Sequence, residues 1–99
     1  MAIALPINTI VSVLDSKAQP VEGLSNLKAF KMPYDENLTI SRGVPAGKGF
    51  TFRFPDRVDA THWSFLLEGT ARYRVVGIKD YQTPFGSHTR VEAELPQGT

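Results

Sequence analysis

The chain has 99 residues, no cysteine and a formal net charge of +1. This length fits one domain with a small core, and the lack of cysteine excludes disulfides, thiolate nucleophiles and cysteine-ligated zinc or iron–sulfur centres. A charge so close to zero argues against a protein whose main activity is to grip nucleic-acid phosphates.

The start of the chain, residues 1–14, is rich in apolar side chains, but it has no basic residue and is interrupted by Pro6. It therefore predicts neither a signal peptide nor a membrane span. We expect residues 1–8 to form an extended segment before the first strand.

The seven prolines and eight glycines are spread along the whole chain. Proline interrupts helices, and turn signals at roughly every 8–12 positions are typical of all-β domains. We therefore predict an all-β fold, with residues 1–99 forming one domain. The expected architecture is a small β-barrel or sandwich of six to seven strands with one long glycine-rich loop.

In chain order, alternation of apolar and polar residues predicts a strand at Thr9–Leu14. Weaker strands are predicted at 27–32 and 37–42, on either side of a polar turn at 33–36. The stretch Gly49–Phe54 alternates more clearly and puts its three phenylalanines on one face. We expect that face to belong to the core.

The strongest hairpin signal is Glu68-Gly69, which separates strand-like stretches at 63–67 and 70–80. Glycine adopts the positive φ angle of a tight turn without strain. A last strand is predicted at 87–95, and its expected outward residues are His88, Arg90, Glu92 and Glu94. From this patterning the predicted core is Val11, Val13, Phe50, Phe52, Phe54, Leu66, Tyr73, Val75, Val91 and Leu95.

Residues 41–49 read S-R-G-V-P-A-G-K-G, and this density of glycine and proline predicts a mobile loop. The glycine spacing around Lys48 does not match a phosphate-binding P-loop. Residues 56–63 have room for one helical turn, because Val58, His62 and Phe65 have roughly helical spacing.

Candidate catalytic and metal-binding residues are few. The chain has two histidines, His62 and His88. Asp59 or Glu92 could join them at a metal ion, but neither histidine belongs to a short-spaced ligand motif. Ser64 lacks the G-x-S-x-G context of an activated nucleophile. We therefore predict no enzyme activity, no metal site and no cofactor.

Aromatic and basic residues are interleaved at 50–54 and at 72–74, as they are in some single-strand nucleic-acid binders. In a strand, however, the aromatic residues fall on one face and the arginines on the other. A stacking platform and its positive charge would then point apart. A small nucleic-acid-binding β-barrel remains an alternative interpretation.

The order of features resembles the head-closure, or stopper, proteins of tailed bacteriophages. The early strand ends in an acidic turn, V-S-V-L-D at 11–15, and a later apolar strand ends in proline, F-T-F-R-F-P at 50–55. A hairpin then leads into A-R-Y-R-V-V-G-I at 71–78. Phe85-Gly86 and a last strand at 89–95 close the pattern.

The resemblance implies a structural subunit of the virion neck, assembled in the host cytoplasm as a homo-oligomeric ring. The implied neighbours are a portal or adaptor protein on the head side and a tail terminator or tail tube protein on the tail side. Double-stranded DNA would pass through the ring, which would help to retain the packaged genome. The aromatic-rich stretch 59–65 departs from the pattern and leaves another neck or tail ring protein, an adaptor or a tail terminator, as an alternative. The residues predicted to face the DNA channel lie in the 41–49 loop and are Arg42, Gly43, Gly47, Lys48 and Gly49.

Overall fold

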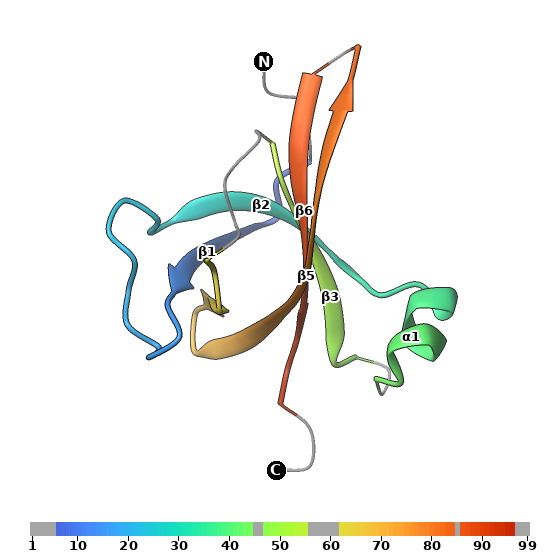
Figure 1. Ribbon diagram of the computed structural model, residues 1–99, viewed down its shortest axis with the longest axis horizontal. Helices are drawn as coiled ribbons and strands as arrows, with labels where there is room; N and C mark the ends of the chain where they lie inside the picture. Colours follow the sequence, from blue (N-terminus) through green and yellow to red (C-terminus); the bar gives the residue numbers. More distant parts are fainter. Residues whose placement is uncertain (1–5, 45–46, 56–61, 85, 97–99) are drawn as a thin grey trace.

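The computed structural model describes residues 6–44, 47–55, 62–84 and 86–96. These residues form a closed antiparallel barrel with strand order β1-β2-β3-β6-β5-β4 (Figure 1). The strands are β1 (Thr9–Leu14), β2 (Leu27–Pro33), β3 (Gly49–Phe54), β4 (Phe65–Glu68), β5 (Ala71–Thr83) and β6 (Gly86–Glu94), and the helix is α1 (Glu36–Arg42).

The barrel closes because β1 pairs with β2 on one side and with β4 on the other. Closure gives every strand two neighbours and removes the unpaired edges that an open sheet would expose. The predicted all-β fold is therefore confirmed, as a barrel of six strands. The predicted boundaries of β1 and β3 are confirmed residue for residue.

The core lies inside the barrel and is built from alternate residues of the strands. Phe52 and Leu66 are fully buried, and the Phe54 and Trp63 rings meet edge to face at 5.3 Å. Three of the predicted core residues are only partly buried and pack against its rim: Phe50, Val75 and Leu95. The patterning missed Trp63 and Ala29, which also belong to the core.

The predicted hairpin joins β4 to β5, and Gly69 in its turn has a φ of +58°. A β-bulge between Val75 and Gly77 shifts the register of β5 against β6. The bulge brings Ile78 rather than Gly77 opposite the buried Val91, so the alternation of inward and outward residues along β5 is shifted by one residue beyond that point. Such a bulge also bends a strand and increases its twist.

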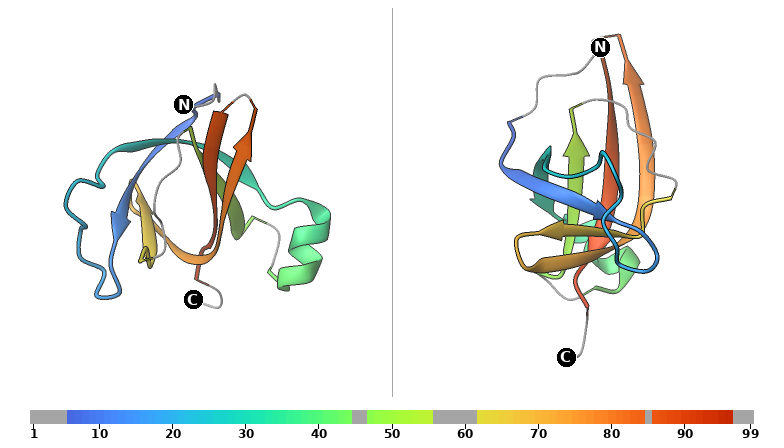
Figure 2. Two further views of the ribbon diagram at one scale, coloured as in Figure 1. Left: turned by 45° about the horizontal axis from the view of Figure 1, so that its top comes forward. Right: turned by 90° about the vertical axis from the view of Figure 1, so that its left-hand side faces the viewer.

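The β5–β6 hairpin is longer than the barrel wall needs. Strand β3 pairs with β6 only as far as Thr89, whereas β5 and β6 remain paired up to Thr83 and Gly86. The two strands therefore project beyond the barrel as an arm, as Figures 1 and 2 show from three directions. We call residues 80–84 and 86–88 the hairpin arm.

The weak strand predicted at 37–42 is wrong, because Glu36–Arg42 is a helix. Asp35 caps its N-terminus by accepting a hydrogen bond from the Leu38 amide at 2.7 Å, and Gly43 ends it in a left-handed conformation with a φ of +64°. These caps satisfy backbone groups that a short helix leaves unpaired. They outweigh the strand propensity of the β-branched residues Thr39 and Ile40.

The helix also shortens the predicted 41–49 loop. Ser41 and Arg42 belong to α1, and Gly49 begins β3. The helical turn predicted at 56–63 falls mostly on residues 56–61, which lie outside the described residues.

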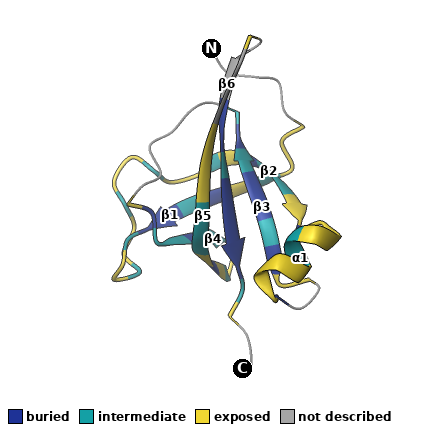
Figure 3. Ribbon diagram, turned by 45° about the vertical axis from the view of Figure 1, so that its right-hand side comes forward, coloured by how far each residue is buried: buried dark blue, intermediate teal, exposed yellow. Residues whose placement is uncertain are grey.

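The last strand differs from prediction in its burial. Its outward residues do point away from the barrel interior, but His88, Glu92 and Glu94 are each only 8% exposed. Figure 3 shows β6 buried along most of its length beside the exposed α1. Segments packed on the outer side of the wall therefore create a second buried layer, which is polar.

Candidate functional site

The residues predicted to face a DNA channel do not form one free loop. Arg42 ends α1, Gly43 caps it, and Gly49 is buried in β3. Gly47 and Lys48 form an exposed turn, in which the Lys48 carbonyl accepts a hydrogen bond from the Leu95 amide at 2.8 Å. Lys48 is therefore the exposed cation of this segment, whereas Arg42 is engaged elsewhere.

The polar layer begins with Tyr34, which lies directly before the helix. Its ring packs against Gly49, where a Cβ atom would sit only 2.2 Å from the ring. Its hydroxyl donates a hydrogen bond to Glu94 at 2.9 Å. Burial and the adjacent Glu94 carboxylate raise the pKa of Tyr34, so its hydroxyl remains a donor at any physiological pH. This side chain ties the start of the α1 segment to β3 and β6.

The end of α1 is held by an ion pair between Arg42 and Glu92 on β6. Arg90 contacts the other oxygen of the same carboxylate at 3.3 Å. The hydrogen bond to Glu92 raises the pKa of Arg42, with burial acting in the opposite direction. Gly77 makes room for the pair, because a Cβ atom there would lie 2.7 Å from the Glu92 carboxylate and 2.8 Å from the Arg42 guanidinium.

The helix itself contributes nothing to the core. None of its residues is buried, and Ile40 is 72% exposed. A helix of two turns is unstable in isolation, so its caps, Tyr34 and the Arg42–Glu92 pair hold it in place. The fold thus fixes an exposed helix rigidly at two points without covering it.

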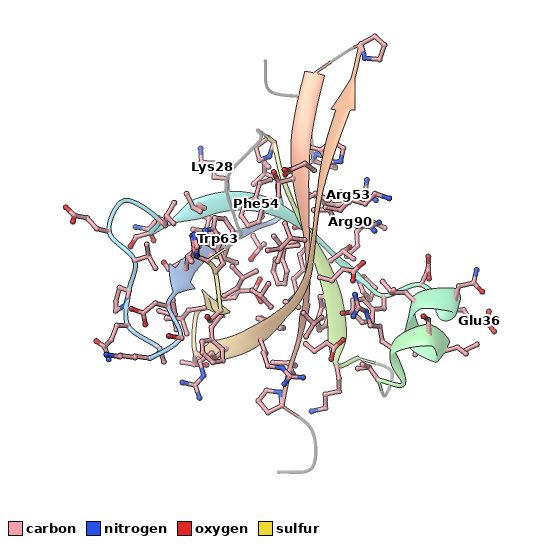
Figure 4. The ribbon with its side chains drawn as sticks, viewed as in Figure 1. Lys28, Glu36, Arg53, Phe54, Trp63 and Arg90 are labelled. Atoms are coloured by element: carbon pink, nitrogen blue, oxygen red, sulfur yellow. The ribbon has the colours of Figure 1, made fainter. Side chains whose placement is uncertain are left out.

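A row of three cations crosses the wall of the barrel between the helix and the hairpin arm. Arg53 on β3 lies directly opposite Arg90 on β6, and Arg90 lies opposite Lys79 on β5. Figure 4 shows Arg53 and Arg90 together outside the wall, with Phe54 and Trp63 on its inner side. The Arg53 Nε is buried without a hydrogen-bond partner. Like charges directly opposite each other destabilise a sheet.

His88 lies two residues before Arg90 and experiences this positive field. Burial lowers its pKa, and Arg53 and Arg90 lower it further. The imidazole is therefore neutral at physiological pH. Sequence patterning placed Arg53 and Arg90 on outward faces, but the strand register that brings them together was not available from the chain alone.

A second polar cluster lies on the inner side of the wall. The Lys31 ammonium contacts the Glu68 carboxylate at 2.7 Å and the Tyr73 hydroxyl at 2.9 Å, and it lies 4.4 Å from the centre of the Phe50 ring. Thr9 donates a further hydrogen bond to Glu68.

The charges in this cluster stabilise each other. Burial acts to lower the pKa of Lys31, but the hydrogen bonds to Glu68 and Tyr73 outweigh it and raise that pKa. For Glu68, burial acts to raise the pKa, and the contacts with Lys31 and Thr9 lower it. The raised pKa of Lys31 and the lowered pKa of Glu68 both favour the charged forms, so the two groups form an ion pair inside the barrel.

The structure does not assemble a metal site among its described residues: no three histidine or carboxylate side chains come together there. His62 is exposed, His88 lies in β6, and Asp59 is outside the described part. The phenylalanines of β3, which a nucleic-acid platform would need, face inward, and Phe52 and Phe54 are at most 2% exposed.

Comparison with protein-family models, with curated proteins and with solved structures found no match. In the described part of the chain, no helix has the length and hydropathy to cross a membrane.

Proposed function

We propose that this chain is a ring-forming structural subunit of a tailed-bacteriophage neck, a head-closure protein that joins the DNA-filled head to the tail and helps to retain packaged DNA. The resemblance in the order of strands and turns supports this assignment. The small closed barrel supplies a rigid body for such a subunit, and no chemistry is required of it.

The observation that carries the proposal is that the barrel has two projections its own core does not use. The helix α1 has no buried residue, and the hairpin arm continues past the last residue of β6 that pairs with β3. Ordering an exposed segment costs conformational entropy. Contact with a neighbouring molecule in an assembly would offset this cost and would explain why the two segments project.

The predicted DNA contact of the 41–49 segment remains part of the proposal, with Lys48 as its cation. Arg42 has a different role, because its guanidinium anchors α1 to Glu92. In a ring, one exposed lysine from every subunit would repeat around the axis. Phosphate contacts of this kind can slow a duplex without reading its sequence.

Phage assembly tests the proposal. Particles made without this chain should be filled heads that lose their DNA and carry no tails. Particles made with Lys48→Ser should assemble but retain less DNA, whereas Lys17→Ser, a matched loss of an exposed lysine in another turn, should behave as wild type. Complete, infectious virions in the absence of the chain would contradict the proposed function. Normal retention with Lys48→Ser would remove only the DNA contact.

A further inference from the structure

Two exposed surfaces of the molecule match each other in spacing and charge. The first is a stripe on α1, where Glu36 and Ile40 are one helical turn apart and Ile40 is 72% exposed. The second is an open groove of about 570 Å³ beside β1 and β2, lined by Ile7, Asn8, Thr9, Ile10 and Lys28.

Like the helix, the groove exposes large apolar side chains. Ile7 is 40% exposed and Ile10 is 51% exposed. Lys28 is the direct cross-strand partner of Ile10, so the two side chains stand next to each other on the outer face of the barrel. An apolar patch with a cation at its border is typical of an interaction surface.

The spacing between Glu36 and Ile40 on the helix agrees with the spacing between Ile10 and Lys28 in the groove. Residues four apart on a helix have Cβ atoms about 5–6 Å apart, which applies to Glu36 and Ile40. Directly opposed residues of an antiparallel pair have Cβ atoms about 4.5–5.5 Å apart, which applies to Ile10 and Lys28. The isoleucine and acid on one surface therefore have about the same separation as the isoleucine and base on the other.

The two surfaces cannot meet within one molecule. Figure 4 shows Lys28 and Glu36 on opposite sides of the barrel. The helix is fixed to the wall through Tyr34 and Arg42 and cannot swing across. Contact between the surfaces must therefore join two copies.

We propose that α1 of one subunit docks into the Ile7–Ile10–Lys28 groove of a second copy, with Ile40 on the isoleucines and Glu36 on Lys28. This contact is heterologous, because each copy uses a different surface at each of its two junctions. Repetition of a heterologous contact produces a ring when its rotation closes. The inference deepens the proposed function and rests on it for closure of the ring.

Each junction involves only a seven-residue helix and a groove lined by five residues, whereas a typical stable interface has roughly 20–30 residues on each side. We therefore expect single junctions to be weak, and a closed ring to gain from every subunit being held on two sides. Association should accordingly be strongly dependent on concentration.

Complementation of two variants tests the contact directly. Ile40→Asp removes the helix surface but leaves the groove, and Ile10→Asp removes the groove but leaves the helix. Each variant alone should be monomeric in sedimentation velocity, with association weakened at least about tenfold relative to wild type. An equimolar mixture should form a one-to-one dimer and nothing larger, because only one intact junction can form.

A charge exchange gives a second readout. Glu36→Lys and Lys28→Glu should each weaken self-association by about fivefold, and the double variant should recover to within about twofold of wild type. Lys17→Glu is the control, since it makes the same charge change at an exposed turn outside the groove. Circular dichroism confirms that each variant is folded.

The outcomes separate the inference from the proposed function. Wild-type-like rings from either aspartate variant, or a mixture that stays monomeric into the millimolar range while the wild type assembles, would overturn the docking contact and leave the ring intact. A wild-type chain that remains monomeric into the millimolar range would overturn both.

Discussion

Replacing Gly49 with alanine should displace the Tyr34 side chain, which holds the start of the α1 segment against the barrel. The new Cβ would lie 2.2 Å from one carbon of the Tyr34 ring and 2.3 Å from another, which is far inside van der Waals contact. The backbone of Gly49 is fixed by its pairing with Glu94 in β6, so the ring must leave. Tyr34, now 9% exposed, would lose its burial and its 2.9 Å hydrogen bond to Glu94.

The expected cost has two parts. Exposing a buried aromatic side chain costs about 1.5–3 kcal/mol, and leaving a buried carboxylate without its donor costs about 1–3 kcal/mol. Gly49→Ala should therefore lower the free energy of unfolding by about 2.5–6 kcal/mol, a large share of the roughly 5–15 kcal/mol of an ordinary domain.

Urea denaturation of a double-mutant cycle measures this effect. In a Tyr34→Ala background the clash is absent, so adding Gly49→Ala should cost less than about 0.5 kcal/mol. Tyr34→Phe, which removes only the hydroxyl, should lose about 1–3 kcal/mol. An equal cost of Gly49→Ala with and without the tyrosine ring would refute the reasoning.

Three further predictions concern the core and the charged clusters. The folded-state pKa of Glu68 is lowered, so its pairing with Lys31 stabilises the fold above the unfolded pKa of roughly 4.3, and this stabilisation is lost as the pH falls through the folded pKa. The urea midpoint should therefore decline less between neutral and acidic pH in Lys31→Met than in wild type. An identical decline in the two proteins would contradict this role of the pair. Burial and the nearby arginines lower the pKa of His88, so Arg53→Gln should raise that pKa in an NMR titration. The same substitution should raise the free energy of unfolding at low salt by about 0.2–1 kcal/mol. An unchanged pKa would show that Arg53 does not act on the imidazole. Phe52→Ala should cost about 3–5 kcal/mol in urea unfolding, because the ring is fully buried; a loss below about 1 kcal/mol would place Phe52 outside the essential core.

The sequence predicted the parts of the fold that depend on local features, such as turn residues and the alternation of apolar and polar side chains. Gly69 marks its turn because it takes a φ of +58°, and the alternation in Gly49–Phe54 is the alternation of the barrel wall. Residues 37–42 were predicted wrongly because β-branched residues there resemble a strand, and the deciding signals were the caps at Asp35 and Gly43.

The candidate site was less predictable, because it depends on contacts between distant residues. Glu92 was expected to face solvent, but Arg42, fifty positions earlier, pairs with it. Only the register of β5 against β6 shows that Gly77 leaves space for that pair. The match between the helix stripe and the groove likewise needs the cross-strand pairing of Ile10 with Lys28.

Electron microscopy of the purified full chain at high concentration tests the central claim most directly. Averaged images should show a closed ring of identical subunits around a channel wide enough for a DNA duplex, with α1 of each barrel on the groove of the next. Isolated barrels at every concentration, or open chains without a channel, would contradict the account.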